Sequence, residues 1–153
     1  MPKFADYPDF TPNVTPQQMF KLGVFGGTYW RPIYSSVVGR HLSGRHKKYN
    51  WTTIPESKLS CSNCDATKNH FGVAAGSSLE DWESKGWIVE QDPYGWVEWY
   101  CNFYYGRRSS DDERQIKRWL AYAGPNGRFQ TRKNKSLVVK QGLLQWAWLV
   151  EEN

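Results

Sequence analysis

The sequence has no uninterrupted run of eighteen apolar residues. Its N-terminal segment, MPKFADYPDFTPNVTPQQ, also lacks the basic start and the apolar centre of a signal peptide. Neither a membrane-spanning helix nor a secretory leader is therefore predicted. We expect an intracellular protein, cytoplasmic or nuclear and not secreted, that has no membrane as its partner.

Cysteine is also scarce, with three residues in a chain of 153. A small, odd number disfavours a disulfide framework and fits a reducing compartment. At 17.9 kDa the chain is long enough to bury a core without such crosslinks. Residues 1–14 are rich in proline and are expected to form an extended N-terminal arm, packed on the body or mobile, while residues 15–153 form a single globular domain.

Motifs of familiar enzyme classes are missing as well. The sequence has no GxSxG, HExxH or Walker-type loop, and Phe25-Gly26-Gly27-Thr28 is too short to cradle a phosphate. An enzyme remains an alternative, a hydrolase or transferase acting on a phosphate or glycosidic bond, with Arg31 or Arg108 as an anion clamp. Its candidate carboxylates are Glu83, Asp92, Glu98, Asp111 and Asp112. Several of them stand where helix caps are expected, which explains them without catalysis.

Aromatic residues, in contrast, make up 16% of the sequence and include nine tryptophans. Five of these tryptophans lie between Asp81 and Trp119, just before and within a run of arginines. Leu and Ile are few, so the core must be built mainly from large rings. Such rings bury a large area per residue.

Capping and turn signals predict short helices over about residues 16–22, 79–85, 93–105 and 110–123. Asp92 and Ser110 are the expected caps of the last two helices, which carry apolar stripes at helical spacing. The stripe residues are Trp96, Trp99, Tyr100 and Phe103 in one helix, and Ile116, Trp119, Leu120 and Ala123 in the other.

The remaining apolar segments predict strands. Glycines separated by β-branched and aromatic residues in 24–54, and the WIV run within 86–90, indicate a small antiparallel sheet. Residues 137–150 are apolar and form either a last helix or a buried strand interrupted by Gly142. The predicted fold class is α+β, a single compact domain with short helices packed on a small sheet around an aromatic-rich core.

The net charge of +5 is unevenly placed, because residues 101–140 hold ten Lys and Arg against three acids, whereas residues 1–100 hold ten against ten. Such asymmetry favours a polyanionic partner. We therefore predict a small basic nucleic-acid-binding protein, with the strand type left open. The expected phosphate contacts are Arg107, Arg108, Arg114, Lys117 and Arg118, backed by Arg128, Arg132, Lys133 and Lys135. Tyr104, Tyr105 and Tyr94 are the candidates for stacking on unpaired bases.

Two other interpretations of the same residues remain open. Arg107 and Arg108 could pair with Asp111, Asp112 and Glu113 and simply fix the junction between two helices. Aromatic and arginine side chains also make protein–protein hot spots, so a structural or interaction protein, such as a virion or chromatin component, is a second alternative. Salt dependence separates this alternative from phosphate binding.

A Cys-x-x-Cys pair offers a candidate metal site. Cys61, Cys64 and His70 could supply three ligands of a structural zinc ion, because thiolates at this spacing suit a tetrahedral metal. His46, His41 or Cys101 could supply the fourth. The alternative is two loop thiols without metal.

Three stretches of the chain carry a resemblance to a known family. GVFGGTYWRPIYSSVVGRHLSG (23–44), GSSLEDWESKGWI (76–88) and DPYGWVEWYCNFYYGRRSSDDERQIKRW (92–119) resemble an uncharacterised family of small proteins of fungi, algae, plants and large DNA viruses. The resemblance implies no particular activity, fold or catalytic residue. The Cys-x-x-Cys pair lies outside these stretches, so a metal there would be a feature of this chain.

Overall fold

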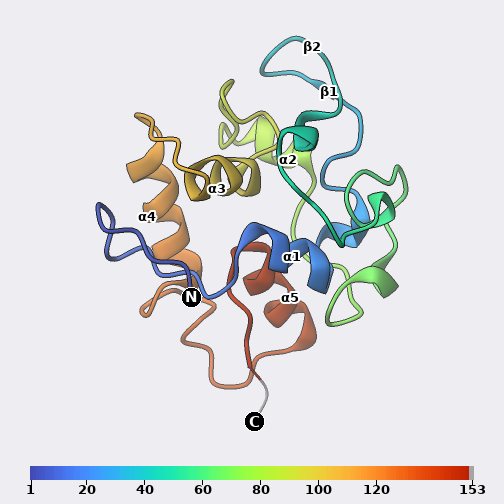
Figure 1. Ribbon diagram of the computed structural model, residues 1–153. Helices are drawn as coiled ribbons and strands as arrows, with labels where there is room; N and C mark the ends of the chain where they lie inside the picture. The colour runs from blue at the N-terminus through green and yellow to red at the C-terminus, as the bar shows by residue number, and fades with distance from the viewer. Residues whose placement is uncertain (152–153) are drawn as a thin grey trace.

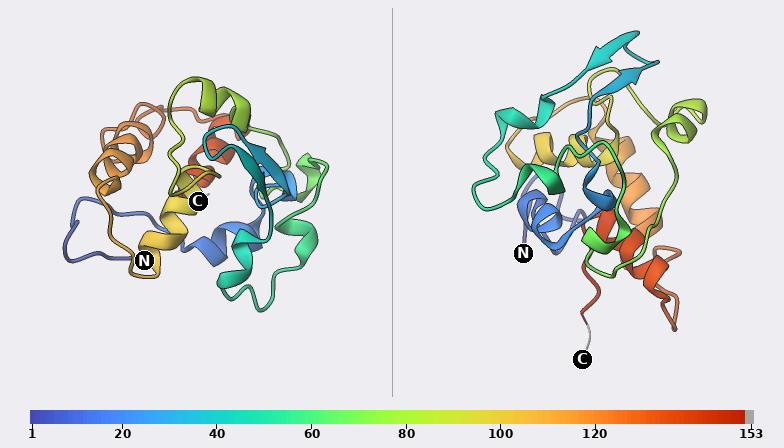
Figure 2. Two further views of the ribbon diagram at one scale, coloured as in Figure 1. Left: turned by 90° about the horizontal axis from the view of Figure 1, so that it is seen from above. Right: turned by 90° about the vertical axis from the view of Figure 1, so that its right-hand side faces the viewer.

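The computed structural model describes residues 1–151, in which five short α-helices and one β-hairpin are joined by loops that contain four short 3₁₀ turns (Figures 1 and 2). This arrangement confirms the predicted single α+β domain with a small antiparallel sheet. No helix in this part of the chain is long and apolar enough to span a bilayer. The elements are α1 (Pro16–Leu22), β1 (Ile33–Ser35), β2 (Arg40–Leu42), α2 (Leu79–Ser84), α3 (Trp96–Tyr104), α4 (Asp112–Ala123) and α5 (Leu137–Gln145).

The first helix has the predicted bounds because its capping signals are local. The Thr15 side chain accepts a hydrogen bond from the backbone N–H of Gln18, and the Gln18 side chain accepts one from the Thr15 N–H. This capping box, together with Pro16, starts α1. Gly23 ends it at a φ of 101°, where a Cβ would lie 1.9 Å from the Lys68 carbonyl oxygen. Only glycine fits this turn.

Two predicted caps are wrong. Helix α3 starts at Trp96 after Gly95, with no side-chain cap, and Asp92 is buried instead, 1% exposed. In α4 the predicted capping box at Ser110 is absent, and Ser110 caps nothing. Ser109 instead donates its backbone N–H and its hydroxyl to the Asp112 carboxylate. The apolar stripes of both helices are nevertheless confirmed, since their aromatic members are buried.

The sheet is smaller than predicted. Only β1 and β2 pair, with Ile33 opposite Leu42, and this hairpin projects at one end of the molecule beyond the helices (Figures 1 and 2). The expected strand at 86–90 is wrong. No neighbouring strand is available there, and the Trp87 carbonyl accepts from the Arg114 guanidinium instead, with N–O distances of 3.3 Å.

The core is a cluster of rings that joins both ends of the chain. Phe10, from the N-terminal arm, is buried among the aromatic stripe of α3 and Trp119 of α4. Asn13 continues this attachment, because its side chain donates to the Leu149 carbonyl and accepts from the Leu149 N–H. The arm is therefore packed on the body.

The C-terminal apolar segment forms a helix rather than a strand. Ser136 caps α5 by accepting from the Val139 N–H. Gly142 does not interrupt the helix; it lies within it where α5 meets a tyrosine of α4. A Cβ at this position would lie 2.6 Å from the Tyr122 hydroxyl oxygen. The glycine thus allows close packing of the two helices.

Candidate functional site

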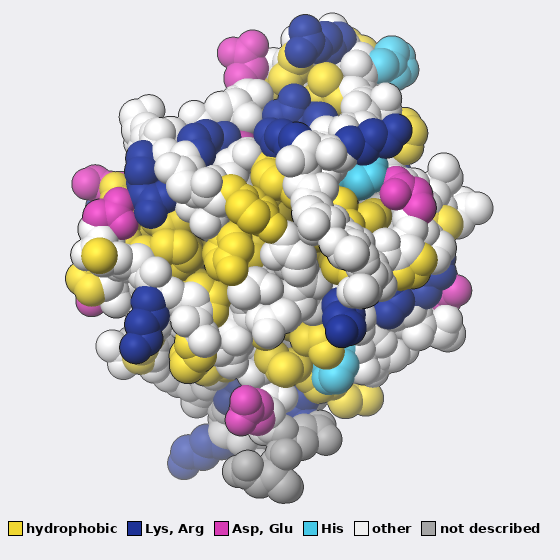
Figure 3. Space-filling model, viewed as in Figure 1, with side chains coloured by type: hydrophobic (Ala, Val, Ile, Leu, Met, Phe, Trp, Pro, Cys, Tyr) yellow, Lys and Arg dark blue, Asp and Glu magenta, His cyan; other side chains and the backbone are white. Residues whose placement is uncertain are grey.

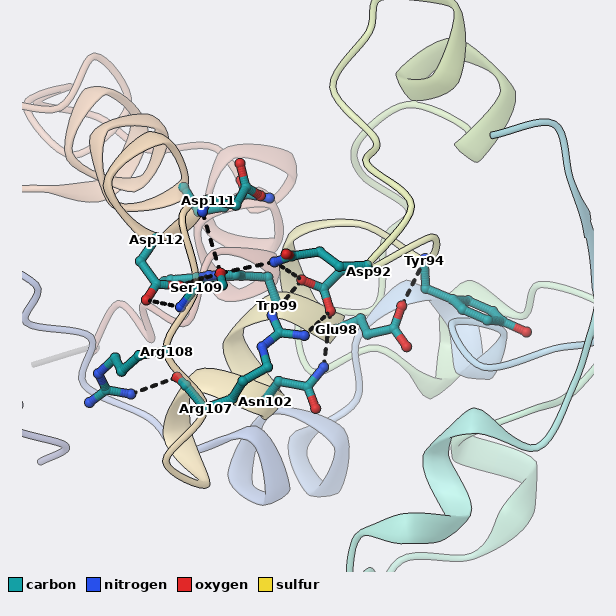
Figure 4. A network of polar contacts seen from close by, with 12 residues as sticks. Asp92, Tyr94, Glu98, Trp99, Asn102, Arg107, Arg108, Ser109, Asp111 and Asp112 are labelled. Atoms are coloured by element: carbon teal, nitrogen blue, oxygen red, sulfur yellow. Dashed lines mark hydrogen bonds and ion pairs between the residues drawn. The ribbon is translucent and has the colours of Figure 1, made fainter. Parts of the chain in front are cut away.

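Arg107, the first of the predicted phosphate contacts, is partly exposed and forms an ion pair with a buried carboxylate (Figure 4). Its Nη1 and Nη2 donate to the Asp92 carboxylate at 2.8 and 2.5 Å. The same carboxylate accepts from the Asn102 amide at 3.0 Å and the Gln91 amide at 3.1 Å. Four donors therefore occupy this carboxylate, and the charge of Arg107 is neutralised inside the protein.

A second buried pair lies in the same region. Glu98, 0% exposed, accepts from Arg45 at 2.6 Å and from the Tyr94 backbone N–H at 3.1 Å. Burial raises the pKa of Glu98, and the nearby Arg45 opposes that rise. Its carboxylate oxygens are occupied like those of Asp92, so both carboxylates serve the packing of α3 rather than an open catalytic site.

Arg108 and Arg114 are also paired with carboxylates. Arg108 binds Asp6 at 2.7 Å and lies over the Phe103 ring, with 3.7 Å between the guanidinium carbon and the ring centroid. Arg114 binds Asp111 at 2.5 Å. Arg107 and Arg108 do pair with carboxylates of the fold, as the alternative interpretation expected. Their partners are Asp92 and Asp6, however, and not the predicted acids at 111–113. Lys117 is exposed.

The three tyrosines predicted to stack on bases have different surroundings. Tyr94 is buried, 2% exposed, so it presents no stacking face; this prediction is wrong. Tyr104 is half-buried, and Tyr105 is 50% exposed and stacks on Tyr49 with 5.3 Å between ring centroids. Hydrophobic and basic side chains adjoin elsewhere too, since Figure 3 shows a hydrophobic patch with Lys and Arg around it.

A deeper feature is a cleft of about 440 Å³ between α2, α4 and the end of α5, which we call the aromatic cleft. Half of its lining residues are aromatic. They are Phe25, Tyr29, Trp82, Trp87, Trp96, Tyr122, Phe129 and Trp146. Aromatic and apolar walls with a few polar groups are typical of small-ligand sites.

Two arginines line the aromatic cleft, and neither is paired with a carboxylate in the part of the chain that the structure describes. The Arg118 guanidinium lies 5.4 Å from the Trp87 ring centroid and 5.3 Å from that of Trp146, and its Nη1 donates to Gln115. Burial, together with the neighbouring Arg114, lowers the pKa of Arg118 to about 10. Arg128 lies over Phe129 at 5.3 Å.

Residues 128–135, RFQTRKNK, extend the positive charge away from the cleft; we call them the basic segment. The segment contains four Lys and Arg and no acid. Arg128, Arg132 and Lys133 are exposed, and none of them forms an ion pair among the residues described. Part of the excess positive charge of residues 101–140 is therefore exposed in the basic segment, which begins at the aromatic cleft.

The cleft was not predicted from the sequence. Its rings come from separate segments, and only Trp96 belongs to a predicted apolar stripe. Trp82 and Trp87 were the residues that could have indicated the cleft. They lie outside both predicted apolar stripes, so the sequence assigned them no place in the core. Of the predicted phosphate contacts, Arg118 and the backing residue Arg128 line the cleft.

Comparison of the chain with protein-family models, curated proteins and solved structures finds no match. The interpretation of the cleft therefore depends on its own residues.

The structure does not bring the predicted zinc ligands together. Cys61 is half-buried, while Cys64 and His70 are exposed. His46 faces Glu56 at 2.6 Å, and Cys101 is buried in the core. No three His, Cys, Asp or Glu side chains within residues 1–151 are placed to hold a metal ion.

Labelling with iodoacetamide at neutral pH is expected to modify Cys61 quickly and to leave Cys101 unmodified in the folded protein. Hydrogen bonding from the Asn63 backbone N–H, with help from Lys68, lowers the pKa of the Cys61 thiol, whereas burial raises the pKa of Cys101. Peptide mass spectrometry over a time course measures both rates. The same experiment in denaturant is the control, because all three thiols should then react; early labelling of Cys101 without denaturant would contradict its burial.

Proposed function

We propose that this protein binds single-stranded nucleic acid through the aromatic cleft and the basic segment. One observation carries the proposal. The aromatic cleft contains Arg118 and Arg128, which form no ion pair with a carboxylate within residues 1–151, and Arg132, Lys133 and Lys135 of the basic segment follow Arg128 along the chain. Proteins that bind single strands combine these two elements, stacking surfaces for bases and a positive track for the backbone.

The physical roles are divided between the two parts. Trp82 and Trp87 offer ring faces on which unpaired bases stack, an interaction worth about 1–3 kcal/mol per base. Arg128, Arg132 and Lys133 are placed to contact successive phosphates, and each contact releases counterions. A duplex hides its base faces, so the aromatic cleft favours an unpaired strand over a double helix.

The alternative of a carboxylate–arginine enzyme has less support. Asp92, Glu98 and Asp112 are buried, and each accepts several hydrogen bonds from the protein. Glu83 binds the Ser36 backbone and Asp111 binds Arg114. None of these carboxylates lines the aromatic cleft.

Fluorescence anisotropy with labelled single- and double-stranded oligonucleotides, at low and moderate salt, tests the proposal. Replacing both Arg118 and Arg128 with alanine is expected to weaken single-strand binding by about tenfold or more, because charge-assisted hydrogen bonds are lost. The slope of log K against log salt should fall in magnitude by about 1 to 1.5, at roughly 0.7 per phosphate contact on a single strand.

The matched control is the double variant Arg40→Ala with Lys47→Ala. Both side chains are exposed and outside the cleft, so this variant removes the same charge from another surface. Equal losses in the two double variants would mean that net charge alone governs binding. Salt-independent curves, or no binding by the unmodified protein, would overturn the proposal and direct attention to protein partners.

A further inference from the structure

We propose that the aromatic cleft holds one nucleotide that ends in a phosphomonoester, with the base against the rings and the phosphate on Arg118 and Arg128. The ligand is either a free mononucleotide or the phosphorylated end of a strand, two sources of the same chemistry. This inference rests on the proposed function and deepens it, because it assigns to the cleft a preference that backbone binding alone does not give.

The size and lining of the cleft suit a single nucleotide. A volume of about 440 Å³ falls at the lower part of the range for small-molecule sites, enough for one base with its sugar and phosphate. Its rings come from separate segments of the chain, including Trp82 and Trp87 from the α2 region and Trp146 after α5. Aromatic rings favour a flat ligand that can stack on them over a ligand of another shape that only fills the cleft.

The cations of the cleft are better suited to a phosphomonoester than to an internal phosphodiester. A partly buried charge is normally paired, yet Arg118 has one protein acceptor, the Gln115 side-chain oxygen, and no acid in the described chain. Its Nε and Nη2 form no hydrogen bond within residues 1–151. A phosphomonoester carries close to two negative charges at neutral pH, and a diester carries one. The two positive charges of Arg118 and Arg128 match the charge of the phosphomonoester more closely than that of the diester.

A path for the rest of a strand adjoins the cleft. A groove of about 310 Å³ shares Phe25, Tyr29 and Trp82 with the aromatic cleft, and Arg31 lines the groove but not the cleft. Thr28 and Ser78 are among its polar lining residues. A strand whose phosphorylated end occupies the cleft therefore has two adjoining surfaces along which its next nucleotides can lie, this groove and the basic segment.

Competition anisotropy measures the preference directly. The labelled probe is a short single-stranded oligonucleotide, and the competitors are the same oligonucleotide with a 5′-phosphate, with a 3′-phosphate or with neither, a nucleoside monophosphate, the matching nucleoside, and inorganic phosphate. We expect one terminal phosphate to raise the affinity of the oligonucleotide by about tenfold or more. The advantage should shrink between pH 7.5 and pH 5.5, because the second pKa of a phosphomonoester is about 6.

Variants locate the effect. Arg118→Ala and Arg128→Ala should each reduce the advantage of the phosphorylated oligonucleotide more than they reduce binding of the unphosphorylated one. Arg40→Ala with Lys47→Ala should leave the advantage intact. Circular dichroism of each variant verifies that it is folded.

The outcomes separate the inference from the proposed function. Equal affinity for phosphorylated and unphosphorylated oligonucleotides would overturn the inference and leave single-strand binding standing, whereas no binding of any oligonucleotide would overturn both. Inorganic phosphate competing as well as the nucleotides would also overturn the inference, since the rings would then contribute nothing. A nucleoside monophosphate that matches the phosphorylated oligonucleotide identifies a free nucleotide as the ligand, and a much weaker one identifies a strand end.

Discussion

Replacing Phe10 with alanine is expected to lower the free energy of unfolding by about 3–5 kcal/mol, a large fraction of the stability of a small domain. Phe10 is 1% exposed, and its ring contacts five aromatic side chains of the core with 5.2 to 6.2 Å between centroids. The substitution leaves a cavity among rigid rings, which cannot collapse into it as aliphatic side chains partly do. Urea denaturation followed by tryptophan fluorescence measures the change.

Phe4→Ala is the matched control for this prediction, because Phe4 belongs to the same arm but is only half-buried. Its ring lies 5.4 Å from that of Phe10 and 4.9 Å from that of Phe103, so some contact energy is lost. We expect Phe4→Ala to lower the free energy of unfolding by about 1–2 kcal/mol. If Phe10→Ala cost no more than Phe4→Ala, the arm would be an accessory to the fold and not part of its core.

The elements that could be predicted from the sequence are those whose signals are local. The capping box of Thr15 and Gln18, the serine that starts α2, and the apolar stripes all depend on residues within a few positions of each other. Helix α1 accordingly has the predicted bounds. The aromatic character of the core was also predictable, since a chain with few Leu and Ile has little else to bury.

The prediction failed where a side chain has a distant partner. Asp92 followed by Pro93 is the pattern of a helix cap, and this local pattern gives no sign of an arginine fifteen residues later. A buried ion pair satisfies the carboxylate more completely than one helix N–H would. The strand expected at 86–90 failed for a related reason, because strands need a neighbour and the Trp87 carbonyl found Arg114 instead.

The aromatic cleft was beyond sequence reasoning because three separate parts of the chain meet in it. Trp87, Arg118 and Trp146 are far apart in sequence, and the cation lies near both indole rings only after α4 and α5 have packed. The composition alone predicted a surface for something flat or anionic. The composition could not distinguish the arginines that pair with internal carboxylates from Arg118 and Arg128, which pair with no carboxylate among residues 1–151.

The second prediction compares two neighbouring ion pairs. In Arg107–Asp92 the carboxylate is buried, and in Arg108–Asp6 it is exposed. Asp92→Ala is expected to lower the free energy of unfolding by about 3–5 kcal/mol. The variant leaves the guanidinium of Arg107 without its acceptor, and the buried Nε of that residue already has none. The Asn102 amide also loses the carboxylate to which it donates. A value near the lower bound is expected, since the Arg107 side chain is 30% exposed and water can reach part of it.

Asp6→Ala breaks an ion pair of similar length at the surface and should lower the free energy of unfolding far less than Asp92→Ala does. The Asp6 side chain is 53% exposed, so water replaces its partner when the pair is broken, and Arg108 still lies over the Phe103 ring. Urea denaturation of both variants, in parallel with the unmodified protein, gives the two costs. A double variant, Asp92→Leu with Arg107→Met, should recover part of the loss, because removing both charges avoids an unpaired cation. Similar costs for Asp92→Ala and Asp6→Ala would mean that burial does not set the strength of these pairs, and Arg107 would then regain its place among the candidate phosphate contacts.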